Sequence, residues 1–434
     1  MTFPVSAFAD IETPFYYYDV ELFRDTLSAV VREAARYENF HVHYAIKANF
    51  NSRLLRMVNE AGLGADCVSG GEVRAALASG IDASKVVFAG VGKTDKEIAF
   101  ALDAGIFCFN VESVPEIEAI EALAAERGVV AQVAVRVNPN IGAHTHSNIT
   151  TGLAENKFGV NYEQLDEVID VIERNSHLKL VGLHFHIGSQ ILVMDDFIAL
   201  CGRINELQEL LADTRGLVLP HINVGGGLGI RYDAPDKYPI PDFELYFSTY
   251  AANLKLHPGQ QLHFELGRSL VAQCGSLITR ATYIKHGTCK KFIIVDAGMN
   301  DLIRPALYDA YHRIENISSS LPDDVYDVVG PVCESSDVFC KDRKMPVTRR
   351  GDIIAIRSAG AYGEAMAFGY NCRELPKACS LKSMPRGSKV SLHSCTFGGK
   401  PSVAAVFLYG CPSDNKNSPP PVSKSKIFTS GVRY

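Results

Sequence analysis

The chain has 434 residues, of which 47% are hydrophobic and 21% charged, and its formal net charge is -6. This length exceeds what one hydrophobic core usually supports, so we expect two domains, or one large barrel with an appendage. The negative net charge and the lack of a basic stretch argue against a nucleic-acid partner.

Targeting features are missing from the first 20 residues, MTFPVSAFADIETPFYYYDV, which show neither the basic nor the apolar region of a secretory signal. No run of about 18 apolar residues predicts a membrane span. The eleven cysteines include no C-x-x-C pair, which favours reduced thiols over disulfides or structural zinc. We therefore expect a cytoplasmic protein that binds no membrane and no metal.

Eight short apolar or alternating runs lie between residues 42 and 267 and predict strands. They are 42–47, 63–68, 85–90, 106–111, 130–138, 178–186, 218–225 and 261–267. Amphipathic stretches between them predict helices at 53–61, 72–79, 95–104, 114–127, 162–175, 196–212 and 242–254. Ser69, Thr94 and Ser113 each precede a glutamate by three positions, the spacing of a capping box. The repeats predict an α/β fold, a closed (β/α)8 barrel of the TIM type.

The pattern changes after residue 268 to β-branched runs without long helices between them. These runs predict a C-terminal β-sandwich or β-barrel domain, which the N-terminal run PFYYYDV is expected to join. Residues 377–434 contain eleven serines and nine Lys or Arg but one acid, a composition typical of a poorly ordered tail. The predicted domains are therefore 22–268 for the barrel, 1–21 with 269–376 for the β domain, and 377–434 for the tail.

Polar residues stand at the ends of several predicted barrel strands. Lys47 ends the first strand, Asp66 and His186 stand at the ends of the second and sixth, Gly225–Gly227 follow the seventh, and Glu265 ends the eighth. Each alone has an ordinary structural explanation, such as a solvent-directed lysine, a capping carboxylate or a tight glycine turn. Their coincidence at the carboxyl ends of barrel strands, where such barrels hold their sites, favours a functional site.

These groups suit pyridoxal 5'-phosphate. A lysine in a largely apolar site has a depressed pKa and can form a Schiff base with an aldehyde. Backbone N–H groups of three glycines can approach a phosphate closely. Glu265 can keep a pyridine nitrogen protonated, and His186 can stack on the ring.

Nine motifs between Thr13 and Pro376 resemble, in order, those of the diaminopimelate decarboxylases, which belong to the alanine-racemase-like group of pyridoxal-phosphate decarboxylases. They are YAIKAN, VSGGE, NPNI with THSNITTGLAENKFG, HFHIGSQ, NVGGGLG, ELGR, DAGMNDLIRPALYDAYH, GPVCESSD and GAYG. The tail 377–434 does not resemble the ending of that family.

The resemblance implies a role for each matching residue. The cofactor would be held by Lys47, Asp66, His186, Ser189, Gly225, Gly226, Gly227, Glu265, Gly267, Arg268 and Tyr362. Lys47, His186, Glu265 and Cys333 would be catalytic. The substrate would be bound by Arg268, Arg304, Tyr308, Glu334 and Tyr362.

The resemblance also implies a homodimer with shared sites, in which Cys333 and its neighbours serve the partner's site and Lys157 pairs with Asp337 across the interface. The expected reaction converts meso-diaminopimelate to L-lysine and carbon dioxide. A second amino acid centre requires a planar cation for its carboxylate, and Arg304 supplies one. Glu334 would receive the ammonium group.

Other functions on the same scaffold remain open at this point. A lysine or ornithine decarboxylase would carry a motif of the form C-D-x-x-D, whereas this chain has C-E-S-S-D at 333–337. An amino-acid racemase would need a second base facing Lys47. A non-catalytic cofactor-binding homologue would be expected to lack the lysine or the glycines. A lysine-dependent aldolase would not require His186, the glycines and Glu265 together.

Overall fold

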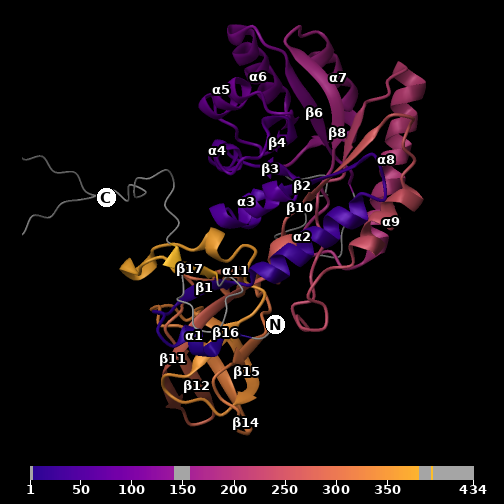
Figure 1. Cartoon of the computed structure of the whole chain (residues 1–434). Coiled ribbons are helices and arrows are strands. Elements are labelled where there is room, and N and C mark those ends of the chain that lie inside the picture. Colours follow the sequence, from indigo (N-terminus) through magenta and orange to yellow (C-terminus); the bar gives the residue numbers. More distant parts are fainter. Residues whose placement is uncertain (1–2, 141–156, 381–391, 394–434) are drawn as a thin grey trace, which may run out of the picture. The chain divides into compact units, whose positions relative to one another are not determined.

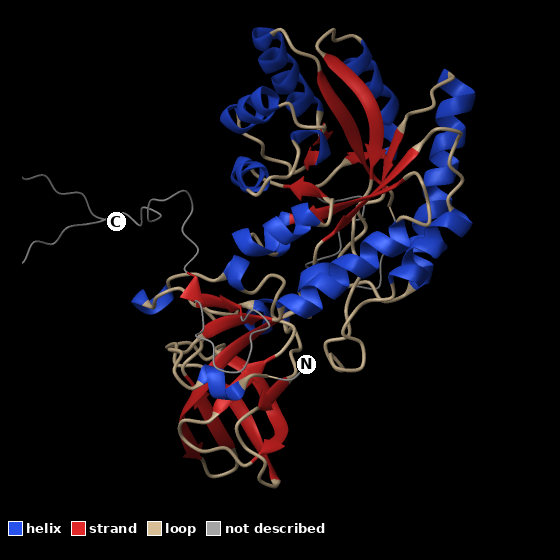
Figure 2. Cartoon of the chain, in the orientation of Figure 1, coloured by secondary structure: helices blue, strands red, loops and turns tan. Residues whose placement is uncertain are grey.

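The structure is a computed structural model that describes residues 3–140, 157–380 and 392–393. Within these ranges no helix is both long enough and apolar enough to cross a membrane. The helices and strands of the described chain can be followed in Figure 1 by their labels and in Figure 2 by their colours.

Eight parallel strands form a closed barrel, as predicted. In chain order they are β2 (Phe40–Ala45), β3 (Gly64–Cys67), β4 (Val86–Phe88), β5 (Cys108–Val111), β6 (Ala131–Asn138), β8 (Leu178–His184), β9 (His221–Asn223) and β10 (Gln261–Leu266). Each strand pairs with its neighbours, β10 closes onto β2, and β5 pairs with β6. The short strand β7 (Val160–Asn161) extends β6 on one side. Because each predicted run overlaps one of the eight strands, the barrel topology is confirmed.

Helices cover the outside of the barrel strands (Figure 2). They are α3 (Ser52–Glu60), α4 (Gly70–Ala78), α5 (Asp95–Ala104), α6 (Val114–Arg127), α7 (Leu165–Glu173), α8 (Met194–Arg215) and α9 (Phe243–Asn253). The sequence interpretation missed α2 (Val20–Ala34), which packs against α9 and β2 and buries Phe23, Leu27 and Val30. Asp19 caps α2 by accepting a hydrogen bond from the Leu22 amide.

The three predicted capping boxes differ in detail. Thr94 and Glu97 form the reciprocal pair at the start of α5. Ser69 and Ser113 cap α4 and α6, but the glutamates three positions later accept from Val68 N and Glu112 N, one residue before the cap. At two of the three sites, Glu72 and Glu116 therefore connect the helix to the residue that follows the preceding strand.

The remaining strands form a second, mostly antiparallel sheet. They are β1 (Phe15–Tyr18), β11 (Gly275–His286), β12 (Lys291–Val295), β13 (Ile314–Asn316), β14 (Asp323–Val329), β15 (Val338–Pro346), β16 (Ile353–Ile356), β17 (Lys377–Ser380) and β18 (Leu392–His393). Short helices α1 (Val5–Phe8), α10 (Arg268–Val271) and α11 (Arg304–Tyr308) lie in the connections. The N-terminal strand β1 pairs antiparallel with β11, which confirms that the run PFYYYDV joins this sheet.

The second sheet continues past the predicted boundary at residue 376, since β17 begins at residue 377 and pairs parallel with β1. Ala378 and Cys379 are buried there, so this segment contributes apolar surface to the sheet in spite of its Ser- and Lys-rich surroundings. The rest of the predicted tail, 381–391 and 394–434, lies outside the described residues.

One cluster of buried side chains runs through both the barrel and the second sheet, and includes Phe88 and Leu277. The segment 360–362 also contacts the loop after β2, where Tyr362 N donates to Ala48 O at 2.8 Å. The division into domains at residue 268 stays a prediction. These contacts bring residues of the second sheet to the carboxyl ends of the barrel strands.

Candidate active site

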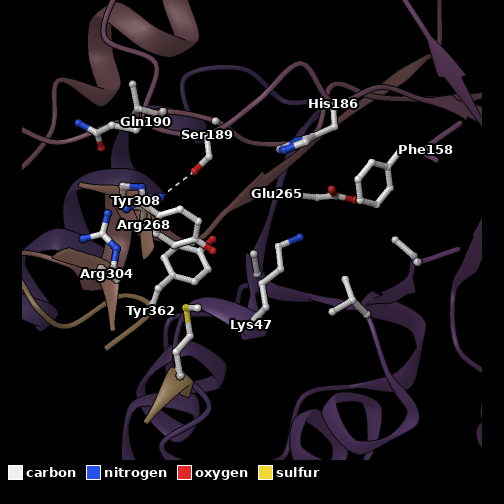
Figure 3. A pocket seen from close by; sticks show the side chains of 18 of the residues that line it. Lys47, Phe158, His186, Ser189, Gln190, Glu265, Arg268, Arg304, Tyr308 and Tyr362 are labelled. Carbon is white, nitrogen blue, oxygen red and sulfur yellow. Dashed lines mark hydrogen bonds between the residues drawn. The ribbon is translucent and has the colours of Figure 1, made fainter. Parts of the chain in front are cut away.

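A cavity of about 960 Å³ lies at the carboxyl ends of the barrel strands. Most of the predicted site residues line it: Lys47, His186, Ser189, Gly227, Glu265, Gly267, Arg268, Arg304, Tyr308 and Tyr362. In Figure 3, Arg268 and Ser189 lie toward one end and Glu265 toward the other, with Lys47 and His186 on opposite sides between them. The sequence interpretation thus correctly identified a set of residues that the fold brings together.

Lys47 lies in a single 3-10 turn, Ile46–Ala48, directly after β2. Its Nζ donates to Asp66 Oδ2 at 3.3 Å, and the Asp66 carboxyl is 1% exposed. Burial lowers the pKa of Lys47, but Asp66 and Glu265 outweigh it and leave the pKa raised. The expectation of a depressed pKa is therefore wrong, because carboxylates lie where an apolar environment was assumed.

Asp66 does not line the cavity directly but lies beside the lysine. Burial and the charge of Glu265 raise its pKa, while Lys47 opposes the rise. Its Oδ1 atom is buried without a hydrogen-bond partner among the described residues. The carboxylate therefore serves to hold the amine rather than to face the cavity.

Glu265 in β10 is surrounded by hydrogen-bond donors. Its Oε1 accepts from Asn110 Nδ2 at 3.2 Å and from Asn223 Nδ2 at 2.8 Å, and its Oε2 lies 3.1 Å from His184 Nε2. Burial raises the pKa of Glu265, but His184 and Lys47 outweigh that effect and hold it below its usual range. The result is a buried carboxylate that stays ionised.

His186 follows β8 and carries a neutral imidazole. Burial and the nearby cations Arg136 and Lys47 lower its pKa well below the usual value. The Gly226 amide donates to His186 Nδ1 at 3.4 Å, which assigns the ring proton to Nε2. A neutral flat ring in this place can cover one face of a planar ligand.

The three glycines after β9 are required by their own surroundings. A Cβ at Gly225 would overlap the Phe185 carbonyl oxygen, and one at Gly226 would overlap the Glu265 carbonyl oxygen. Gly227 has φ +108°, in the region that favours glycine, and it alone of the three lines the cavity. The glycines thus allow the strand ends to pack closely as well as leaving the backbone accessible.

Arg268 marks the end of the cavity away from Glu265. Its Nη1 donates to Tyr232 Oη at 2.7 Å and its Nη2 to Ser189 Oγ at 3.0 Å, while its guanidinium lies 4.9 Å from the centre of the Tyr362 ring. The Nε atom is buried and has no partner among the described residues. Gly267 lies close to Ala48 and Ala45, so a side chain there would crowd the turn that holds Lys47.

Arg304, at the start of α11, is 5% exposed and lines the same cavity. Its Nη1 lies 2.9 Å from His312 Nε2, and its guanidinium lies 5.1 Å from the centre of the Tyr232 ring. Because His312 Nδ1 donates to Arg357 O at 2.8 Å, His312 Nε2 is the acceptor for Arg304. Burial lowers the pKa of Arg304, and its Nε has no partner among the described residues.

Besides Asp66, Gly225 and Gly226, two further predicted residues, Cys333 and Glu334, do not line this cavity. Cys333 is exposed, and its amide donates to Asn371 Oδ1 at 3.4 Å. The exposed Glu334 carboxylate accepts from Tyr370 Oη at 2.7 Å. Both therefore lie outside the cavity of their own chain.

The predicted intersubunit pair between Lys157 and Asp337 stays a prediction, and the surroundings of Asp337 do not favour it. Asp337 is 3% exposed, and its carboxylate accepts from the Met299 and Val332 amides at 2.7 Å each. It therefore holds the turns of its own chain, a role that the charge pattern alone does not reveal. Part of the motif before Lys157, residues 141–156, lies outside the described residues.

Several site residues were missed by the sequence interpretation: Asn110, Asn223, His184, Tyr232, His312, Arg136 and Phe158. Asn110, Asn223 and His184 were detectable in principle, because each is a polar residue in an apolar run that points into the barrel. Nothing local marks Tyr232, which lies in an irregular loop and meets Arg268 only through the fold.

The donor set fits pyridoxal phosphate. Arg268 offers an unpaired Nε beside Ser189 and the glycine loop, which suits a phosphate. Lys47 supplies an amine for the aldehyde, and Glu265 supplies an ionised acceptor for a protonated ring nitrogen. These groups lie along one cavity in an order that suits a flat molecule with an anionic arm.

Comparison with known proteins agrees with this site. Residues 24–272 match the family described as pyridoxal-dependent decarboxylase, pyridoxal binding domain. A diaminopimelate decarboxylase from Bacteroides thetaiotaomicron is 62% identical over 375 residues, which span 86% of this chain and 97% of that protein.

Solved structures show the same architecture. The diaminopimelate decarboxylase from Helicobacter pylori, solved with L-lysine, matches with a TM-score of 0.82 and 39% identity over 89% of this chain and 95% of that one. A lysine/ornithine decarboxylase from Vibrio vulnificus matches with a TM-score of 0.75 at 21% identity over 88% of this chain and 97% of that one, which shows a shared fold alone. The chain therefore belongs to the diaminopimelate decarboxylase family, whose members are enzymes that use pyridoxal phosphate as cofactor.

Proposed function

We propose that the chain converts meso-diaminopimelate to L-lysine and carbon dioxide, as its relatives' names indicate for them. The observation that carries this proposal is the buried guanidinium of Arg304 in the cavity that also contains Lys47 and Glu265. Arg268 is engaged by Tyr232 and Ser189 at the phosphate end. Arg304 is thus the cation available to a substrate carboxylate, which a simple diamine-forming decarboxylase does not need to bind.

The cofactor, when bound, supplies an electron-accepting ring that takes up the electron pair left when the carbon–carbon bond to the departing carboxylate breaks. Lys47 Nζ would hold the cofactor through its aldehyde group. Glu265 stays ionised and would accept a hydrogen bond from the protonated ring nitrogen. His186 would cover the ring with its neutral imidazole, and Arg268 with Ser189 and Gly227 would bind the phosphate.

Substrate orientation follows from the other end of the cavity. Arg304, Tyr308 and Tyr362 all line the cavity. Arg304 and Tyr308 would receive the distal carboxylate, and Tyr362 would contact both substrate and cofactor. The substrate carbon must gain one proton when carbon dioxide leaves, and the Cys333 thiol is the group we assign to deliver it. The additional substrate contact predicted for Arg268 stays a prediction.

We further propose that two chains share their sites in a homodimer. Among the described residues that line the cavity there is neither Cys333 nor Glu334. This supports the assignment of the proton donor and the ammonium-binding group to another chain. Both lie beside the exposed Tyr370, and Phe368 nearby is also exposed. Exposed aromatic residues next to unused functional groups are typical of an interface.

A cytoplasmic location is part of the same proposal. The nine cysteines of the described residues are all free thiols. Free thiols, five of them buried, suit a reducing compartment.

Product analysis tests the function. Purified protein with pyridoxal phosphate should release carbon dioxide and L-lysine from meso-diaminopimelate, and it should release diamine from ornithine or lysine only at a much lower rate. Equal rates with ornithine would contradict the assignment of Arg304, and the absence of any product from meso-diaminopimelate would reject the function.

The shared site is tested by mixing two inactive variants. Lys47→Ala and Cys333→Ala damage different components of one site, so a mixed dimer retains one site in which both residues are intact. Activity should rise when the variants are refolded together and stay absent for each alone. No recovery, with mixed dimers demonstrated by tag exchange, would show that each site is built from one chain.

A further inference from the structure

The amide side chain of Asn223 connects the two ends of the cofactor site. Asn223 ends β9, immediately before the glycine loop, and is 5% exposed. Its Nδ2 donates to Glu265 Oε1 at 2.8 Å, and its Oδ1 accepts from the Gly225 amide at 2.9 Å. One side chain therefore contacts both the carboxylate assigned to the ring nitrogen and the loop assigned to the phosphate.

The orientation of this amide is determined by its neighbours. The Gly225 amide can only donate, so the atom facing it must be the oxygen of Asn223. The nitrogen then has to face Glu265, where it acts as a donor. A donor in that place favours a carboxylate that accepts, which is the ionised form.

Asn110 provides a comparison within the same site. Its Nδ2 also donates to Glu265 Oε1, at 3.2 Å, and its side chain is 1% exposed. Within the described part of the chain, the Asn110 side chain forms no hydrogen bond to the glycine loop. Both asparagines therefore donate to the Glu265 carboxylate, but of the two only Asn223 also binds the glycine loop.

The glycine loop and Glu265 are also coupled through the backbone. Glu265 N donates to Gly225 O at 2.7 Å, and Gly226 packs against the Glu265 carbonyl oxygen. Displacement of the carboxylate would therefore be expected to move the loop, and Asn223 is the side chain that restrains both.

We infer that Asn223 is a positioning residue that sets the orientation of Glu265 and of the Gly225–Gly227 loop together. The ring nitrogen and the phosphate of one cofactor molecule can then bind at the same time. Asn110 and His184 orient the carboxylate only. The inference rests on the roles proposed above for Glu265 and the glycine loop, and it concerns cofactor binding rather than the choice of substrate.

Binding of two ligands to the apoprotein separates these functions. Pyridoxal phosphate engages both ends of the site, whereas pyridoxal lacks the phosphate. Calorimetry gives a dissociation constant for each, and their ratio measures what the phosphate contributes. Asn223→Ala, Asn223→Asp and Asn110→Ala are compared with the wild type, and the melting temperature of each apoprotein reports folding.

Asn223→Ala should weaken pyridoxal phosphate binding by about ten- to a hundredfold, because a hydrogen bond to a charged group is lost together with a loop restraint. The ratio of the two dissociation constants should fall toward one. Asn110→Ala should weaken both ligands by a similar factor and leave the ratio at the wild-type value. Asn223→Asp keeps the acceptor for Gly225 but places a second carboxylate against Glu265 in place of the donor, so it should weaken both ligands while preserving the ratio.

Two results would overturn the inference: wild-type affinity for pyridoxal phosphate in Asn223→Ala, or a loss in that variant that leaves the ratio unchanged. If Asn223→Ala melts well below the wild type, Asn223→Asp provides the test. Its ratio of the two dissociation constants must then equal the wild-type ratio. No substrate is present in these measurements. Failure of the inference therefore leaves the decarboxylation assay unaffected, and failure of the proposed reaction leaves these binding constants unaffected.

Discussion

Removal of the Arg304 guanidinium tests the substrate assignment most directly. The side chain is 5% exposed, lies 5.1 Å from the centre of the Tyr232 ring and donates to His312 Nε2 at 2.9 Å. A carboxylate bound by such a group is largely desolvated. Arg304→Ala leaves that carboxylate without its partner and should cost about 2 to 5 kcal/mol in transition-state binding.

This free energy corresponds to a loss of about thirty- to five-thousandfold in kcat/KM for meso-diaminopimelate. The variant also leaves the buried His312 Nε2 without its donor, which should lower the free energy of unfolding by about 1 to 3 kcal/mol. The two effects are separable, because the first depends on the substrate and the second does not.

The assay compares meso-diaminopimelate with lysine, which lacks the distal carboxylate. The wild-type enzyme should strongly prefer meso-diaminopimelate, and Arg304→Ala should lose that preference while its low efficiency with lysine changes little. Arg127→Ala serves as a matched control, because Arg127 forms an ion pair on the surface with the exposed Asp103. Equal losses for both substrates, or no loss for meso-diaminopimelate, would refute the reasoning.

Three further predictions concern the barrel. Lys47→Ala should abolish decarboxylation, and borohydride reduction followed by mass spectrometry should find the cofactor attached at Lys47 in the wild type and nowhere in the variant. Gly226→Ala should destabilise the protein by about 1 to 3 kcal/mol in urea unfolding, because its Cβ overlaps the Glu265 carbonyl oxygen. Gly92→Ala, where a Cβ meets nothing within 4 Å, should change stability by less than about 0.5 kcal/mol, and similar values for the two would contradict the packing argument. Burial lowers the pKa of His43 to about 4 in the folded protein. As the pH drops, the unfolded chain therefore takes up this proton before the folded chain does. The free energy of unfolding should fall by up to about 3 kcal/mol between about pH 6.5 and pH 4. His43→Gln should flatten this dependence, and an unchanged slope would exclude His43 as its source.

Much of the site could be predicted because strand ends and periodicity are local properties. Lys47, His186 and Glu265 each follow or end an apolar run, and the barrel rule places such residues on one rim. The same rule would have included Asn110 and Asn223 if polar residues inside the runs had been considered. Cys333 and Glu334 were recognised only by resemblance, and their exposed positions agree with a role toward another chain.

The ionisation of Lys47 could not be predicted, because it depends on distances between side chains from different strands. Asp66 and Glu265 are 19 and 218 positions away in the sequence, yet both act on the amine and raise its pKa. The surroundings of Asp337 could not be predicted for the same reason. Its carboxylate was expected to be free for a partner, whereas two backbone amides of its own chain occupy it.

The sequence by itself determined the eight-strand barrel, the sheet that includes the N-terminal strand, and the lysine, histidine, glycines and glutamate of the rim. These features follow from patterns that repeat every two to four residues, and such patterns report which face of a strand or helix is buried. Only the tertiary structure decided which groups meet: Asn223 with Glu265, Tyr232 with Arg268, and His312 with Arg304. Those contacts join separate elements, and their geometry depends on the packing of the whole barrel and sheet rather than on any local run of residues.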